Sequence, residues 1–238
     1  MSSALNRVTI QLASLCAIAV LISTVSYLAL STIEIDGDLA SGLSMGATAL
    51  GLMLFSRLFA MQPARMLTTS YPTQIAAALA LGAISVTATS FFYLPIESVR
   101  LGLIGISAAL FEEVIFRGLP LLIILRESCA PLASGGIILL TSIAFSSLHP
   151  SLHPVMYVDR LVFSVLAFHL ATATESVWPA VAYHLFSNSA AIALVYSFED
   201  ASEWAILIAD LAIFVGIRTI VATSWVVAHG PVGGIWNR

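Results

Sequence analysis

The composition of the chain is that of a membrane protein. Its 238 residues are 59% hydrophobic and only 9% charged, and the mean hydropathy is +1.01. Soluble domains carry about 25% charged residues, so this chain has too little charge to cover a soluble surface. Its formal net charge is −4, and it contains no basic run. The composition therefore excludes a soluble globular enzyme, a disordered chain and a nucleic-acid-binding module.

Eight apolar segments approach or reach the length that a transmembrane helix requires, which is about 20 residues. Helices are expected because lipid offers no partner for free backbone groups. We predict an all-α, polytopic bundle with a single domain over residues 1–238. The fifth and sixth segments are the shortest and can instead be re-entrant or tilted, which leaves seven spans as an alternative. The segments are, in chain order, Val8–Leu30, Leu39–Leu58, Thr73–Leu94, Leu101–Leu125, Leu132–Leu148, Val155–Ala173, Val177–Phe198 and Trp204–Val227.

The arginines between the segments indicate an orientation. Segment 8–30 is expected to be a retained span, because its apolar stretch is too long for a signal peptide. If eight spans alternate, the side richer in arginine faces the cytoplasm. This predicts both termini inside, in a bacterial or archaeal cell membrane. One side holds Arg7, Arg57, Arg65, Arg126 and Arg238, and the other holds Arg100 and Arg160.

Span four contains adjacent carboxylates, Glu112 and Glu113, followed by Arg117. Ionisable residues inside a span are costly and are functional candidates by default. Glu113 and Arg117 are four residues apart and can pair on one helix face. Glu112 points about 100° away and lacks that partner, which suits it to general acid–base chemistry. A structural ion network between helices is the alternative interpretation of the Glu113–Arg117 pair.

Span five ends in Phe145 and His149, four residues apart, directly before Pro150. Proline disfavours a helical conformation in the residue before it, so we expect the helix to stop at His149. A neutral imidazole at that position can accept a proton from a water molecule or orient it. An interfacial histidine at a helix end is the alternative.

Span seven places His184 and Asn188 one turn apart on one helix face. Both side chains can donate a hydrogen bond to one oxygen, as in an oxyanion hole. Polar contacts between membrane helices are the alternative interpretation. The chain has no HExxH zinc motif and no Gly-x-Ser-x-Gly motif. Glu112, His149 and His184 are nevertheless residue types that can ligate a metal ion.

The three motifs, EExxxR, FxxxH and HxxxN, occur in this order between Phe111 and Asn188. This ordered set resembles the CPBP family, also called the CAAX protease and bacteriocin-processing or Abi family. The resemblance covers about a third of the chain, residues 111–188, and implies an intramembrane glutamic peptidase. It implies a membrane-anchored protein or peptide as substrate and the lipid bilayer as environment, and it leaves the oligomeric state open.

The resemblance also implies roles for individual residues. Glu112 and His149 correspond to the residues that activate a water molecule, and His184 and Asn188 correspond to the oxyanion hole. The implied cavity lies between spans four, five and seven.

Glu113, Arg117 and Phe145 correspond to supporting residues of the site. No cofactor and no metal are implied.

The implied substrate classes are prenylated CAAX termini, leader peptides and C-terminal sorting tails. The predicted orientation puts His149 near the external face, which favours an exported protein with a sorting tail. A non-catalytic peptide-binding or immunity factor of the same fold is the main alternative. A small transporter with Glu112 in a proton relay is a third, although we find no internal repeat.

Other polar or small residues inside the spans are expected to serve packing. Asp159 and Arg160 are assigned to packing or to the interface, because neighbours on a helix do not face each other. Asp210 in span eight is expected to contact another helix. Gly42 and Gly46 form a GxxxG pattern that we interpret as a helix-packing face.

Overall fold

A computed structural model of the chain describes residues 21–22, 24–26, 28–30, 37–58, 72–93, 98–126, 131–149, 154–198 and 202–229. Within these ranges the regular secondary structure is entirely helical, and no strand is present. This confirms the predicted all-α fold for the described part of the chain.

The predicted segments after the first coincide with helices to within a few residues. Segment 101–125 is divided into three consecutive elements, while each of the others is one helix. Most of the first segment, Val8–Leu30, lies outside the described residues. The elements are α2 (Gly37–Leu58), α4 (Pro72–Tyr93), α5 (Ser98–Glu113), the π-helix η1 (Val114–Gly118), α6 (Leu119–Arg126), α7 (Pro131–Leu148), α8 (Pro154–Thr174), α9 (Trp178–Ser197) and α10 (Glu203–His229).

Two of the described helical stretches, Pro154–Thr174 and Glu203–Ala222, are long and apolar enough to cross a membrane by length and composition. Shorter apolar stretches occupy Leu39–Leu52, Ala76–Phe92 and Leu132–Leu148. The count of eight spans, and a cavity between the fourth, fifth and seventh, therefore stay predictions.

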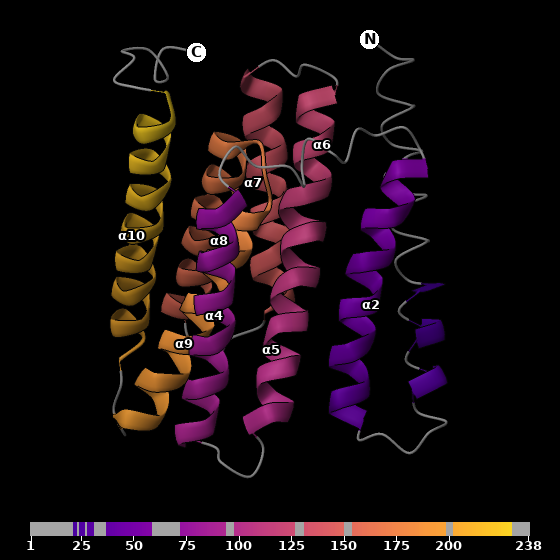
Figure 1. Ribbon diagram of the computed structural model, residues 1–238, viewed down its shortest axis with the longest axis vertical. Helices are drawn as coiled ribbons and strands as arrows, with labels where there is room; N and C mark the ends of the chain where they lie inside the picture. Colours follow the sequence, from indigo (N-terminus) through magenta and orange to yellow (C-terminus); the bar gives the residue numbers. More distant parts are fainter. Residues whose placement is uncertain are drawn as a thin grey trace.

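Two helical stretches occupy the middle of the bundle (Figure 1). Helix α9 packs against α4, α5, α8 and α10, and helix α5 packs against α2, α4 and α9. Helix α2 lies beside α5 towards one side of the bundle, and α10 lies beside α8 and α9 towards the other. The motif-bearing helices α5 and α9 are therefore surrounded mainly by protein.

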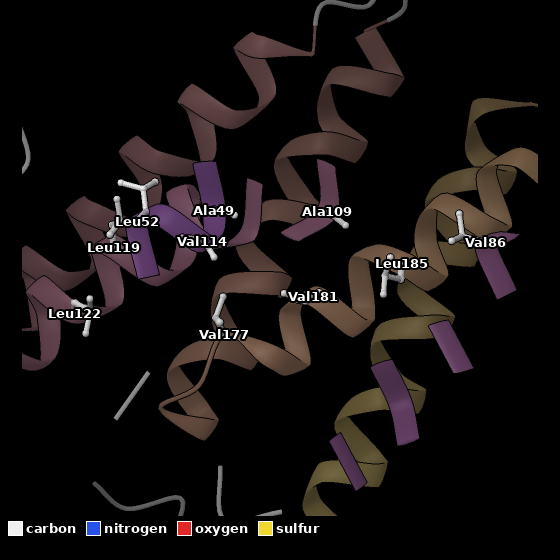
Figure 2. Packing of buried hydrophobic residues seen from close by; sticks show 10 residues of the cluster. All are labelled: Ala49, Leu52, Val86, Ala109, Val114, Leu119, Leu122, Val177, Val181 and Leu185. Atoms are coloured by element: carbon white, nitrogen blue, oxygen red, sulfur yellow. The ribbon is translucent and has the colours of Figure 1, made fainter. Parts of the chain in front are cut away.

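An apolar cluster holds these central helices together (Figure 2). Val177, the residue before α9, is followed at intervals of four by Val181 and Leu185 of that helix, so the three lie on one face. In lipid, such clusters stabilise a bundle through van der Waals packing rather than exclusion of water. The face of α9 meets buried residues of α2, α4, α5, η1 and α6, namely Ala49, Leu52, Val86, Ala109, Val114, Leu119 and Leu122.

Small residues allow α2 to lie close to α5. A Cβ atom built on Gly42 would lie 2.8 Å from Cγ1 of Ile104, and one on Gly46 would lie 3.1 Å from Oγ of Ser107. Both distances are shorter than ordinary van der Waals contacts. The GxxxG pattern is therefore a packing face within the chain, as the sequence predicted.

Candidate active site

The helix that carries the paired glutamates changes its hydrogen-bond pattern directly after Glu113. There α5 ends and the π-helix η1 begins, and the backbone N–H of Leu119 bonds the carbonyl oxygen of Val114. We attribute the change to Pro120, which has no N–H and whose ring would clash with a carbonyl four residues earlier in a regular α-helix. Single π-helical turns are frequent at functional sites.

Glu113 and Arg117 form a buried ion pair on consecutive turns. Nη1 of Arg117 lies 3.0 Å from Oε1 of Glu113, and both side chains are 0% exposed. The spacing of four residues predicted this contact. Removing either partner would leave a buried charge without compensation, which is strongly unfavourable. The pair therefore fixes the orientation of the helix on which Glu112 also lies.

Aromatic rings surround the guanidinium of Arg117. Its Cζ atom lies 4.2 Å from the ring centroid of Phe145 and 5.5 Å from that of Phe163. Nη1, Nη2 and Nε of Arg117 donate no hydrogen bond of good geometry within the described residues. Cation–π attraction and the charge of Glu113 therefore hold the guanidinium in place.

His184 on α9 reaches the same carboxylate. Nδ1 of His184 lies 2.8 Å from Oε1 of Glu113, and the His184 side chain is only 6% exposed. A carboxylate accepts and does not donate, so Nδ1 of His184 carries the proton in this contact. The hydrogen bond fixes the ring and turns Nε2 towards Glu112, whose Oε2 is 3.8 Å away.

His149 approaches Glu112 from the end of α7. Nε2 of His149 lies 3.4 Å from Oε2 of Glu112. These two side chains are 33% and 17% exposed, whereas Glu113 and Arg117 are fully buried. Of the two adjacent carboxylates, Glu112 is thus the more accessible one.

The spacing of the FxxxH motif has a direct structural reason. Nδ1 of His149 donates to the backbone carbonyl oxygen of Phe145 at 2.8 Å, while the backbone N–H of His149 bonds the carbonyl of Ser146. The side chain thus satisfies a carbonyl that the helix end leaves without its usual partner. Since Nδ1 is the donor here, Nε2 is the atom that can exchange a proton with Glu112.

Asn188 lies one turn beyond His184 on α9 and is half-buried. No hydrogen bond joins its amide to another residue in the part of the chain that the structure describes. The structure therefore brings Glu112, Glu113, His149 and His184 into one cluster, with Asn188 adjacent to it on the same helix.

Two residues beside the site, Phe163 and Tyr183, lie outside the three sequence motifs. The ring centroid of Phe163 lies 5.0 Å from that of His184 and 4.7 Å from that of Tyr183. Phe163 on α8 thus joins Arg117 to His184. The only sequence signal was indirect, because Tyr183 directly precedes a motif histidine. Phe145 contacts the rings of His149 and His184 as well, and it is 1% exposed.

Among the described residues, no group of three or more His, Cys, Asp or Glu side chains is arranged to hold a metal ion. The carboxylates and imidazoles of the cluster themselves supply groups for acid–base chemistry. A carboxylate beside two imidazole nitrogens can remove a proton from a nucleophile and return it to a leaving group.

Comparison with known proteins identifies the segment that carries this cluster. Residues 95–190 match the family model described as type II CAAX prenyl endopeptidase Rce1-like. The comparisons with curated proteins and with solved structures gave no match. The matched segment contains all the candidate site residues from Glu112 to Asn188. Residues 95–190 are thus similar to the Rce1-like type of the CPBP family, a family of membrane-embedded proteases.

Proposed function

We propose that the chain is an intramembrane glutamic endopeptidase that hydrolyses a peptide bond near a membrane-anchored terminus of its substrate. One observation carries the proposal. Oε2 of Glu112 faces Nε2 of both His149 and His184, at 3.4 Å and 3.8 Å, inside a helical bundle. Catalytic hydrogen bonds are often long in a free enzyme and shorten when substrate binds.

In the proposed first step, Glu112 and His149 activate a water molecule. Oε2 of Glu112 takes a proton from the water as its oxygen attacks the peptide carbonyl carbon. Because Nδ1 of His149 is committed to the carbonyl of Phe145 at 2.8 Å, Nε2 is free to share the proton with Glu112. General base catalysis of this kind contributes about 10²–10⁴-fold to a rate.

The tetrahedral intermediate requires donors for its oxyanion, and we assign this role to His184 and Asn188. Nδ1–H of His184 is directed to Glu113, so Nε2 can donate only when both ring nitrogens are protonated. The amide of Asn188, one turn away, makes no hydrogen bond to the described residues and can donate without any change of protonation.

The reaction ends when the carbon–nitrogen bond breaks. The proton that Glu112 took from the water passes to the departing amine nitrogen, which leaves a carboxyl group on one product and an amine on the other. Glu112 and His149 then return to their starting protonation states. No covalent enzyme intermediate and no metal ion takes part in this scheme.

The substrate is proposed to be a protein or peptide held in the bilayer by a lipid or an apolar tail. Its cleavage site would be of the CAAX, leader or sorting-tail type. With both termini in the cytoplasm, the end of α7 that carries His149 lies towards the external face. This orientation favours an exported protein with a C-terminal sorting tail over a cytosolic prenylated protein.

The decisive experiment is complementation of cells that lack this protein. Wild type, Glu112→Gln and Glu175→Gln are expressed at equal abundance, checked by blotting, and the masses of membrane-anchored and exported proteins are compared. Glu175 lies in an exposed turn between α8 and α9, so its amide variant is the matched control. We expect wild type and Glu175→Gln to restore a shortened product, while Glu112→Gln accumulates the precursor.

The identity of that precursor would also give the substrate class and the side of the membrane. If Glu112→Gln restores processing fully, Glu112 is not the general base. The alternative of a non-catalytic peptide-binding or immunity factor then becomes the better description of the cluster.

A further inference from the structure

A layer of three aromatic rings joins helices α8, α9 and α10. The ring centroid of Tyr183 lies 4.7 Å from that of Phe163 and 6.0 Å from that of Phe214. The interplanar angles are 19° and 67°, which correspond to a stacked pair and an edge contact. Tyr183 is thus the central member of a chain of contacts that crosses the three helices.

One helical turn from this layer, each helix presents an oxygen-bearing side chain. Asp159 precedes Phe163 by four residues, Ser187 follows Tyr183 by four, and Asp210 precedes Phe214 by four. Short connections join α8 to α9 and α9 to α10, so neighbouring helices run antiparallel. Four residues back along α8 and α10 is therefore the same direction in space as four residues forward along α9. Asp159, Ser187 and Asp210 thus form a second layer on the same side of the aromatic layer.

The second layer is buried and its oxygens lack hydrogen bonds. The exposed fractions are 0% for Asp159, 2% for Ser187 and 1% for Asp210. Both carboxylate oxygens of each aspartate, Oγ of Ser187 and Oη of Tyr183 have no hydrogen-bond partner in the described part of the chain. Buried carboxylates without partners are unfavourable, and structures normally pair them or bind a cation to them.

The side chains of this second layer lie close to one another. Asp159 and Asp210 are close enough for mutual electrostatic interaction, and Tyr183 interacts with both. Ser187 lies near the carboxylate of Asp210 and near the hydroxyl of Tyr183, although neither contact has the geometry of a hydrogen bond. Ser187 and Tyr183 thus lie beside the carboxylates without donating a hydrogen bond of good geometry to them.

The charge of the layer is only partly balanced. Nε of Arg160 lies 3.9 Å from Oδ2 of Asp159, and Arg160 also interacts with Asp210. His184 acts on Asp210 as well, but its ring already faces the carboxylate of Glu113. If both carboxyl groups are ionised, one guanidinium balances only one of the two buried negative charges.

We propose that Asp159, Tyr183, Ser187 and Asp210 bind a monovalent alkali cation, for which Na⁺ is the probe, between α8, α9 and α10. Carboxylate and hydroxyl oxygens suit hard cations and not the thiolate- or imidazole-binding metals. A single positive charge neutralises the excess that Arg160 leaves. Such an ion would join three helices and fix Tyr183, which directly precedes His184. This inference does not depend on the proposed peptidase activity.

Binding is measured directly on the purified full chain in lipid nanodiscs. Radioactive Na⁺ is titrated by equilibrium dialysis, and Tm is followed as NaCl replaces choline chloride at constant ionic strength. We expect saturable binding of one Na⁺ per chain. We also expect a Tm that rises with the logarithm of the Na⁺ concentration once it exceeds the Kd.

Two serines of α9 provide matched variants. Ser187→Ala removes a proposed ligand and should weaken Na⁺ binding about tenfold. Ser189→Ala should leave it unchanged, since Ser189, which is also buried, donates to the carbonyl of Leu185 at 2.9 Å. Asp210→Asn should abolish binding. If this variant fails to fold, the Na⁺ titrations of wild type and Ser187→Ala still test the proposal.

Three results would overturn the proposal. The first is the absence of saturable Na⁺ binding together with a higher Tm for Asp159→Asn/Asp210→Asn, which would indicate carboxyl groups that share a proton. The second is stabilisation by Ca²⁺ but not by Na⁺. The third is equal Na⁺ affinity of the Ser187→Ala and Ser189→Ala variants, which would place any bound ion elsewhere.

Discussion

Nδ1 of His184 donates a hydrogen bond of 2.8 Å to Oε1 of Glu113, although the two residues are 71 positions apart in the sequence. The same oxygen lies 3.0 Å from Nη1 of Arg117. One buried carboxylate therefore orients both the candidate oxyanion donor and the helix that carries Glu112. The second glutamate of the motif organises the cluster, while the first faces the two histidines.

Asn188→Ala separates the oxyanion role from stability. We expect kcat/KM to fall by about 10²–10³-fold, the effect of losing one oxyanion donor. Tm should change little, because the half-buried amide makes no hydrogen bond to the described residues. Peptidase assays on the purified chain and thermal unfolding in detergent provide the two measurements. Ser189→Ala on the same helix is the control, and wild-type kcat/KM in Asn188→Ala would remove this residue from the site.

His184→Ala should reduce both activity and stability. The substitution removes the donor to Glu113 and the ring that Phe163 contacts at 5.0 Å. A buried carboxylate oxygen left without its donor costs about 1–3 kcal/mol. We therefore expect a lower Tm for His184→Ala than for Asn188→Ala. Equal Tm values would show that the hydrogen bond from His184 to Glu113 does not stabilise the chain.

Arg117→Met should destabilise the chain by about 3–5 kcal/mol, because it leaves the fully buried Glu113 without its cation. The double variant Arg117→Met/Glu113→Gln should recover part of this loss, since the isolated charge is then gone. Chemical denaturation in mixed micelles measures both. The single variant Glu113→Gln is measured as well. If the double variant loses as much unfolding free energy as the two single variants together, or more, the pair is not coupled through charge.

Phe163→Ala tests a residue that no sequence motif includes. Its ring contacts Arg117, Phe145, Tyr183 and His184, and loss of a buried phenylalanine costs about 3–5 kcal/mol. Phe92→Ala on α4 is the matched control, since Phe92 is 77% exposed. Similar unfolding free energies for the two variants would argue against a role of Phe163 in holding the site together.

Gly42→Ala should weaken the contact between α2 and α5. The added Cβ would lie 2.8 Å from Cγ1 and 3.1 Å from Cα of Ile104, so the backbones must separate. Gly216→Ala on α10 is the control, because no atom lies within 4 Å of its Cβ position. We expect a lower Tm for the first variant and an equal or higher Tm for the second, as alanine favours helix. The reverse order would exclude close packing at Gly42.

Much of the fold followed from the sequence because lipid restricts the choices. Apolar segments of about 20 residues must be helices in a bilayer, and the helix bounds agree with the predicted segments to within a few residues. The π-helix η1, which ends two residues before Pro120, was not predicted. Hydropathy indicates that a helix exists, but not how its hydrogen bonds rearrange around a missing N–H.

Contacts within one helix were also predictable. The Glu113–Arg117 pair follows from spacing by four residues. Phe145 and His149 were expected on one face, yet the bond from the imidazole to the Phe145 carbonyl was not predicted. It depends on the backbone of His149 turning away from the helical hydrogen-bond pattern.

The sequence by itself determined the membrane class, the helices, the three motifs and the separation of Glu112 from the Glu113–Arg117 pair. Only the tertiary structure decided that His184 bonds Glu113, that Phe163 contacts Arg117, and that Asp159 and Asp210 share a buried layer. The physical reason is that periodicity assigns a residue to a face of its own helix. Which faces meet depends on the packing of all the helices together, and local sequence does not encode it.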